Sequence, residues 1–203
     1  MNQPLWSIMI PTTVDRDELY EKLCEELFNQ IASNGLNFNE HIEVIGMRDN
    51  KEISVGLKRQ RLLEMAKGVF VSGFDSDDFP HPDYIHDIWN ALYIHGNHID
   101  HVGFIEDCDI DGLKSQSIFS IKHKSWDEQE PGYDQVRCAN PKSVIRREKA
   151  LQVGYLDMRF GEDRIFAEKV TPLLKDEIFI EKPLYRYIHI SSPFNERYGI
   201  QTT

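Results

Sequence analysis

The chain has 203 residues, of which 40% are hydrophobic and 28% are charged, a globular composition. Its 34 acidic and 23 basic residues give a net charge of −11, which disfavours a broad nucleic-acid-binding face. No apolar run reaches the roughly 18 residues of a membrane span, and the N-terminus lacks the basic and apolar regions of a signal peptide. Three widely spaced cysteines, without metal spacing, favour reduced thiols. We therefore expect a cytoplasmic protein.

The N-terminal part begins with a predicted strand and helix. An apolar run over residues 5–10, closed by Pro11, is typical of a buried strand. Asp15 and Glu18 match a capping box, and leucine or isoleucine then recurs every four residues over 19–31. This pattern predicts an amphipathic helix that begins at the capping box.

Strands and helices continue to alternate up to Gly96. Residues 42–46 and 69–74 are apolar enough for buried strands, and helices are predicted over 55–67 and from Pro82 onward. Alternation at this spacing implies parallel pairing of the strands. The first half of the chain is therefore predicted to be an α/β unit.

The pattern changes after Gly96. Strand-like segments over 99–106 and 117–123 are joined through Asp111-Gly112, a hairpin signal. Residues 107–112 also have the opening spacing of a calcium loop, but its twelfth position is Ile118 rather than glutamate, so a hairpin tip is the better interpretation. A later basic stretch is most simply the polar face of a helix; it consists of Lys142, Arg146, Arg147 and Lys149.

Polar clusters follow three of the predicted strands, over residues 11–13, 48–50 and 75–78. In open α/β sheets, ligands bind beyond the carboxyl ends of the strands. The third cluster holds three carboxylates within four residues, which repel one another unless a cation lies among them. Hard oxygen ligands suit Mg²⁺ or Mn²⁺, so this cluster is a candidate metal site, with a solvated acidic turn as the alternative.

Five segments in order carry a family resemblance over about residues 5–193. They are Ile10-Pro11-Thr12; Gly56-x-Lys58-Arg59 in a helix; Asp75-Ser76-Asp77-Asp78 followed by Pro82; Gly161-Glu162-Asp163 after an acceptor-side segment from Cys138 to Tyr155; and Leu184-Tyr185-Arg186-Tyr187-x-His189. This series resembles the family-two glycosyltransferases of the GT-A fold. The chain departs from that family in carrying Gln60 where an asparagine is usual.

The resemblance implies a fold, a reaction and a cofactor. It implies a Rossmann-like three-layer α/β fold with a central mixed, mainly parallel sheet. It also implies transfer of a sugar from a nucleotide-diphosphate sugar, with UDP-sugar favoured, to an acceptor hydroxyl with inversion, assisted by Mn²⁺ or Mg²⁺. We expect one domain over 1–203, with a donor-binding half at about 1–95 and an acceptor and catalytic half at about 96–190. Two interpretations are open for the tail over 191–203: a flap that orders over the donor, or a frayed terminus.

The resemblance assigns roles to individual residues. Asp163 is the expected catalytic base, and Glu162 is expected to orient the acceptor or the base. The expected metal ligands are Asp75, Asp77, Asp78 and His189. The expected donor contacts are Thr12, Asp49, Lys58, Arg59, Asp75 and, from the tail, Arg197.

Each assignment has a structural alternative. Asp49 suits a turn, and Lys58 with Arg59 suits a solvated helix face. The acidic pair 162–163 suits the N-terminus of a helix, where carboxylates are stabilised by the helix dipole. His189 suits a buried strand histidine.

Two other classes of protein compete with a transferase. A sugar-nucleotide nucleotidyltransferase can share the architecture, but residues 11–14 lack its Gly-rich loop with arginine and lysine. A non-catalytic sugar-binding module does not require the carboxylates. The expected acceptor is a glycan or another soluble hydroxyl compound; a modified DNA base ranks below it because of the net charge. Oligomeric state is not predicted.

Overall fold

The computed structural model describes residues 3–189. Its strands are β1 (Trp6–Thr13), β2 (Ile42–Asp49), β3 (Phe70–Gly73), β4 (Phe79–Pro80), β5 (His101–Ile110), β6 (Leu113–Phe119), β7 (Gln135–Arg137), β8 (Val144–Arg146) and β9 (Glu177–His189). Its α-helices are α1 (Asp17–Ser33), α2 (Val55–Met65), α3 (Tyr84–His95), α4 (Arg147–Val153) and α5 (Glu162–Val170). Short 3₁₀ helices cover Val14–Arg16 and Thr171–Leu173. The predicted tail and Arg197 lie outside the described residues.

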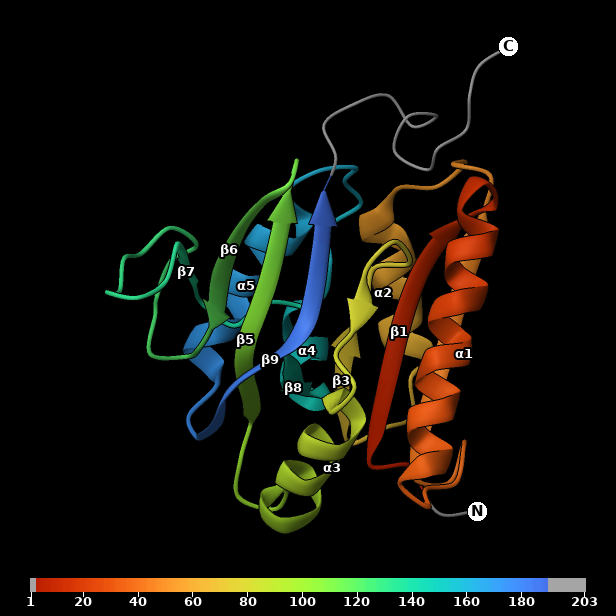
Figure 1. The fold of residues 1–203 in the computed structure, drawn as a ribbon, viewed down its shortest axis with the longest axis horizontal. Coiled ribbons are helices and arrows are strands. Elements are labelled where there is room, and N and C mark those ends of the chain that lie inside the picture. The colour runs from red at the N-terminus through yellow and green to blue at the C-terminus, as the bar shows by residue number, and fades with distance from the viewer. Residues whose placement is uncertain (1–2, 190–203) are drawn as a thin grey trace.

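The described strands form one mixed sheet. Its main order is β2-β1-β3-β8-β5-β6-β7, and β9 pairs with both β5 and β4. The pairs of β1 with β2 and with β3 are parallel, which confirms the α/β prediction for the first half. Strands β5 and β6 form the predicted antiparallel hairpin, which turns at Asp111 and Gly112, both with positive φ. Strand β9 runs parallel to β5, crosses the sheet and ends beside the carboxyl end of β5 (Figure 1).

Two apolar clusters give the three-layer arrangement. On one face, Trp6 and Ile8 of β1 pack with Leu27 of α1 and Ile88 of α3. On the other face, Met9 of β1 packs with side chains of α2, α4 and α5. Alternate residues of β1 therefore enter opposite layers, as the period of a strand requires (Figure 1). None of the described helices is both long and apolar enough to cross a membrane.

Two local predictions are wrong. The capping box is not formed: a 3₁₀ turn over Val14–Arg16 precedes α1, and no side chain caps either helix. Asp15 instead forms an ion pair with Lys51 at 2.7 Å, because the chain leaving β1 passes close to the loop after β2.

The basic stretch is not one helix face either. Lys142 lies before β8 and Arg146 ends that strand, so only Arg147 and Lys149 belong to α4. Arg146 pairs with Asp100, and the Lys142 ammonium lies between the carboxylates of Asp78 and Glu106. The short strand β8 between β3 and β5 interrupts the expected helix.

Candidate active site

A hollow of about 260 Å³ opens at the carboxyl end of β1. Predicted donor residues Thr12 and Lys58 line it, together with Arg16 and Lys51 from the neighbouring loops. The Oγ1 atom of Thr12 is buried and has no hydrogen-bond partner among the described residues. Because buried hydroxyls are nearly always paired, this atom makes the hollow a candidate binding site for a polar ligand.

Lys58 ties the two parallel strands together beside this hollow. Its ammonium donates to the carbonyl oxygen of Thr12 at 2.6 Å and forms an ion pair with Asp49. Asp49 Oδ2 also accepts the backbone N–H of Ile53 at 2.8 Å. Burial alone would raise the pKa of Asp49, but Lys58 and this N–H bring it below the ordinary value. Lys58 is therefore a buried link, which excludes the solvated helix face for this residue.

Arg59 connects residues 75–78 after β3, here called the aspartate loop, to α5, the helix that carries the predicted catalytic residues. Its guanidinium donates to Asp75 Oδ1 at 2.6 Å and to Glu162 Oε1 at 3.3 Å. Arg59 and Glu162 are both buried. Burial raises the pKa of Glu162, and the charge of Arg59 opposes that change. One side chain on α2 thus holds together two motifs that lie far apart in the sequence.

Groups of β9 hold the aspartate loop in place through hydrogen bonds. Tyr185 Oη accepts the backbone N–H of Asp75 at 3.1 Å and donates to Asp78 Oδ2 at 2.7 Å. Asp78 Oδ1 accepts the backbone N–H of Ile188 at 3.2 Å. The Lys142 ammonium lies 3.4 Å from Asp78 Oδ2 and 2.8 Å from Glu106 Oε2. Both carboxylate oxygens of Asp78 therefore already have hydrogen-bond partners within the described part of the chain.

The other two aspartates of the loop also contact cations. Asp77 Oδ1 accepts from Arg16 at 2.9 Å, as Asp75 does from Arg59. Within residues 3–189, no three histidine, cysteine, aspartate or glutamate side chains are grouped as a metal site. His189 ends β9, with its ring stacked on Tyr187, and is not grouped with the aspartates.

A divalent ion nevertheless suits the chemistry of the loop. Asp75 and Asp77 carry the hard carboxylate oxygens that Mg²⁺ and Mn²⁺ prefer. Their present partners are cationic guanidinium groups, so both positions favour positive charge. Two carboxylates plus ligand phosphate oxygens form the kind of incomplete site that Mg²⁺ uses with nucleotides.

The acidic pair begins α5. Gly161 precedes it with φ of 79°, a left-handed conformation that glycine adopts readily. Glu162 is buried against Arg59, whereas Asp163 is partly exposed and accepts the backbone N–H of Arg164 at 2.8 Å. Burial raises the pKa of Tyr155, and the negative charges of Glu162 and Asp163 add to that rise. The two carboxylates therefore face different surroundings, one buried and one open.

The loop before α5 is docked on the first turn of α2. The backbone N–H of Gly56 donates to the carbonyl oxygen of Met158 at 3.1 Å. A side chain at position 56 would meet the carbonyl oxygen of Leu156, which explains the glycine. Gln60, the departure from the family pattern, accepts the backbone N–H of Tyr155 at 2.7 Å. Its longer side chain thus has a role in fixing this loop.

Several residues of the site were not predicted. Arg16 and Lys51 carry no motif, because they approach Asp77 and Asp15 only through the loops after β1 and β2. Tyr185 stood inside a recognised segment, but its hydroxyl contacts could not be read from spacing. Lys142 was misplaced because the short strand β8 was not expected.

The arrangement defines a class of fold. A mixed sheet in three layers, with an aspartate loop after β3 and an acidic pair opening α5, is the glycosyltransferase GT-A-like fold. No protein-family model matches the chain, and no curated protein matches its sequence.

Solved structures of S. aureus TarS share this fold. The chain is similar to TarS 1–349 in complex with UDP-GlcNAc at 16% identity and a TM-score of 0.62, over 95% of this chain and 60% of that one. The likeness to TarS 1–349 in complex with UDP has 16% identity and a TM-score of 0.61, over 98% of this chain and 63% of that one. Full TarS gives 16% identity and 0.61, over 98% of this chain and 38% of that one. The chain thus spans less than two thirds of the length of these proteins.

Proposed function

We propose that this protein is a glycosyltransferase that moves a sugar from a nucleotide-diphosphate sugar, with UDP-sugar favoured, to an acceptor hydroxyl with inversion. The observation that carries the proposal is the network around Arg59, which joins the aspartate loop to the Glu162–Asp163 helix beside the hollow at Thr12. The likeness to a fold that has been solved with UDP-GlcNAc and with UDP in TarS supports it.

The donor is assigned to the hollow and the aspartate loop. The unpaired Thr12 hydroxyl would bond the base, beside Asp49, whose carboxylate we assign to the base N–H. Arg16 and Lys51 add positive charge for the diphosphate. Asp75 and Asp77 would hold Mn²⁺ or Mg²⁺, which would supply Lewis-acid stabilisation of the leaving diphosphate. Asp78 keeps the loop in place through Tyr185, and His189 remains a predicted further ligand.

The transfer step is assigned to Asp163. Its carboxylate takes the proton of the acceptor hydroxyl while that oxygen attacks the anomeric carbon. The bond from this carbon to the diphosphate oxygen breaks on the opposite side, which inverts the anomeric configuration. Glu162, fixed by Arg59, orients the acceptor or the base. The open position of Asp163 suits a base that must reach an incoming substrate.

The acceptor is a glycan or another soluble hydroxyl compound, and the cytoplasm is the proposed compartment. A modified DNA base ranks lower, because a chain with net charge −11 offers little attraction to a polyanion.

Donor hydrolysis tests the proposal. The protein is incubated with UDP-GlcNAc, UDP-glucose or UDP-galactose, and UDP release is measured with Mn²⁺ and with EDTA. We expect Mn²⁺-dependent UDP release from one of these donors and none from Asp163→Asn. Release of pyrophosphate from UTP plus a sugar phosphate would instead identify a nucleotidyltransferase. Binding of the donors without any turnover would identify a binding module.

A further inference from the structure

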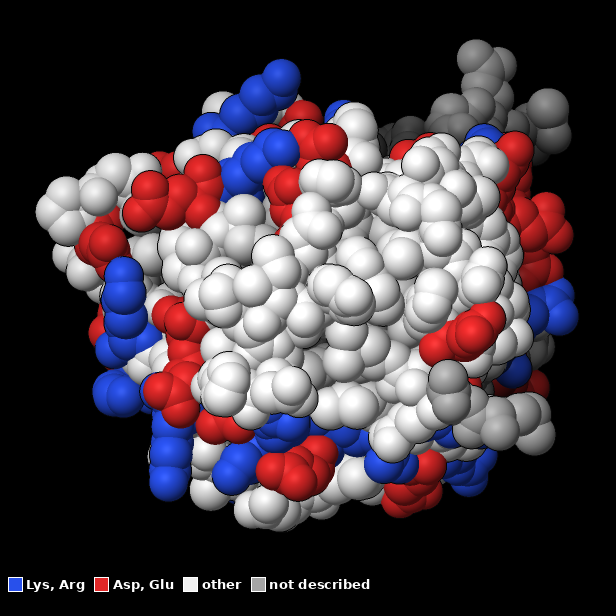
Figure 2. Space-filling view, turned by 90° about the horizontal axis from the view of Figure 1, so that it is seen from below, with Lys and Arg blue, Asp and Glu red and all other residues white. Residues whose placement is uncertain are grey.

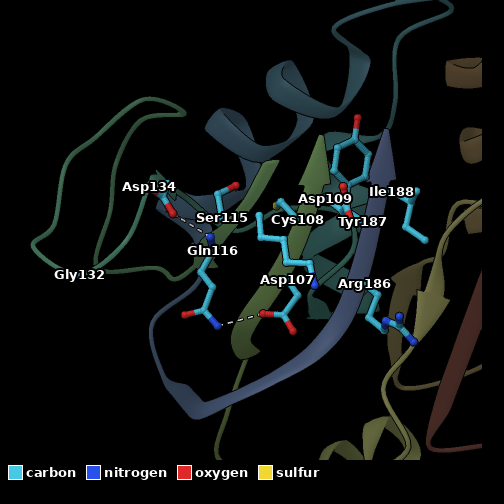
Figure 3. Close-up of a pocket in the computed structure, with 11 residues that line it drawn as sticks. Asp107, Cys108, Asp109, Ser115, Gln116, Gly132, Asp134, Arg186, Tyr187 and Ile188 are labelled. Atoms are coloured by element: carbon cyan, nitrogen blue, oxygen red, sulfur yellow. Dashed lines mark hydrogen bonds between the residues drawn. The ribbon is translucent and has the colours of Figure 1, made fainter. Parts of the chain in front are cut away.

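A second and larger hollow lies on the face formed by β5, β6 and β9. Its volume is about 480 Å³, within the roughly 300–1,000 Å³ of small-ligand sites. Asp107 and Gln116 extend from adjacent strands on its floor, and Arg186 of β9 lies beside them (Figure 3). The loop residue Asp134 forms its far side (Figure 3). This hollow, called the groove from here on, includes none of the predicted donor, metal or catalytic residues.

The polar side chains of the groove are held in fixed positions. Asp107 Oδ1 accepts the side-chain amide of Gln116 at 2.9 Å (Figure 3). Its Oδ2 lies 3.0 Å from His81 Nε2. Asp134 Oδ2 accepts the backbone N–H of Gln116 at 2.9 Å. The Asp107 side chain is still 40% exposed, and a carboxylate can accept further hydrogen bonds. The groove is therefore preorganised, and its groups remain accessible to a ligand.

The chemistry of the lining favours a neutral polyol. Three carboxylates (Asp107, Asp109 and Asp134) and two cations (Lys114 and Arg186) line the groove. This excess of carboxylates disfavours a phosphate or another polyanion. Adjacent acceptors and donors, such as Asp107 with Gln116 and Arg186, match vicinal hydroxyls, each of which both donates and accepts.

The groove adjoins the aspartate loop through β9. Ile188, which lines the groove, donates its backbone N–H to Asp78 Oδ1 at 3.2 Å. Tyr187, also in the lining, has the Lys142 ammonium 4.2 Å from its ring centroid, and that ammonium lies 3.4 Å from Asp78 Oδ2. A molecule in the groove therefore lies one strand away from the loop that is assigned to the donor.

We propose that this groove binds the acceptor as a neutral oligosaccharide, with Asp107, Gln116 and Arg186 bonding its hydroxyl groups. This inference rests on the proposed function, because it names the acceptor of the same reaction. It also gives a use to the hairpin of β5 and β6, whose acidic residues resembled a calcium loop.

Oligosaccharide binding tests the inference. Saturation-transfer NMR of the full chain is recorded with chitotetraose, maltotetraose and cellotetraose, and with a heparin tetrasaccharide as the anionic probe. We expect at least one neutral probe to bind. Gln116→Ala and Arg186→Ala should each weaken its affinity by about ten-fold, the effect of losing one hydrogen bond to a charged or well-placed group. The matched changes Gln152→Ala and Arg61→Ala, at exposed positions on α4 and α2, should leave that affinity unchanged.

UDP binding to the same samples separates the two proposals. If UDP binds but no neutral probe does, the groove inference is wrong and the donor site stands. If a neutral probe binds equally well to the Gln116 and Arg186 variants, the glycan lies elsewhere and the inference is also wrong. Preference for the heparin probe overturns the neutral class. If the unmodified chain does not bind UDP, the proposed function is contradicted, whatever the result for the groove.

Discussion

At the scale of single residues, the site depends on one buried cation. Arg59 is always charged, and a guanidinium that is only 7% exposed requires carboxylate partners. Asp75 and Glu162 supply them from two separate segments. Removing one partner of a buried ion pair typically costs about 3–5 kcal/mol, because it leaves an uncompensated charge. Arg59 thus couples the position of the aspartate loop to that of α5.

Replacing Asp163 by asparagine tests the base. The amide keeps the shape of the side chain but cannot take a proton, so transfer should fall by roughly 100-fold to 10,000-fold. UDP affinity, measured by calorimetry, should stay within about two-fold, because Asp163 is not among the residues that line the hollow at Thr12. Parallel loss of UDP binding and transfer would instead make Asp163 a donor ligand or a helix cap.

Replacing Asp77 by alanine tests the metal. The proposed ion loses one of two carboxylates, and Lewis-acid stabilisation is worth several kcal/mol, so transfer should fall by roughly 100-fold or more. Manganese titration should show weaker activation, while the melting temperature changes little, because Asp77 lies in a loop outside the apolar clusters. Full activity of this variant, or equal turnover of the unmodified chain in EDTA, contradicts the metal assignment.

The roles of residues were less predictable than their identities. The motifs brought Asp75, Glu162 and Arg59 to attention separately, and the structure joins them. Spacing along the chain carries no information about which side chains meet across segments more than 80 residues apart. The contact of Arg59 with Glu162, 103 residues further along the chain, could not be predicted for this reason.

At the scale of elements, the first half of the fold was the most predictable. Apolar runs located β1, β2 and β3, and four-residue periodicity located α1, because buried strands and amphipathic helices leave these patterns in a sequence. The short strands β4, β7 and β8 were not predicted, because two or three residues show no periodicity. They are set by the strands beside them.

The contact between α2 and the loop before α5 rests on Gly56. Alanine in a helix is normally favoured over glycine by about 0.5–1 kcal/mol. Here a Cβ would lie 2.0 Å from the carbonyl oxygen of Leu156, so backbone must move. We expect Gly56→Ala to destabilise the protein by roughly 1–3 kcal/mol, measured by urea unfolding. Transfer should fall more than UDP affinity, because the displaced loop leads to Asp163. Increased stability would show that the loop is not docked there.

At the scale of the whole molecule, the charge is unevenly distributed. Seen from below, at the end opposite the carboxyl end of β1, uncharged side chains form a broad central area with charged ones at its margins (Figure 2). This face shows no basic stripe that would track a nucleic-acid backbone.

The two halves of the sheet are joined by a buried polar cluster around Glu177 at the start of β9. Glu177 Oε1 lies 2.8 Å from His101 Nδ1 of β5, and its Oε2 accepts from Ser120 at 2.7 Å. His101 Nε2 lies 2.6 Å from the Ser143 hydroxyl. Burial would raise the pKa of Glu177, but His101, Ser120 and the N–H of Ile121 bring it below the ordinary value. Ser143, His101 and Glu177 are linked in the order of a catalytic triad. His101 is fully buried and out of reach of a substrate, so the cluster stabilises the fold.

This lowered pKa gives stability a defined pH dependence. A carboxyl whose pKa is lower in the folded protein binds fewer protons there than in the unfolded chain. Its contribution is therefore fully present above the unfolded value of 4.5 and is lost as the pH falls through the lower folded value. Glu177→Gln should reduce the free energy of unfolding by about 1–3 kcal/mol at pH 7. Urea titrations of both proteins should converge as the pH falls below 4.5.

As a control, Glu148→Gln on α4 should change stability little at either pH, because Glu148 is not in the buried set. A constant difference between Glu177→Gln and the unmodified protein across this range would mean that Glu177 contributes by packing and not by its charge.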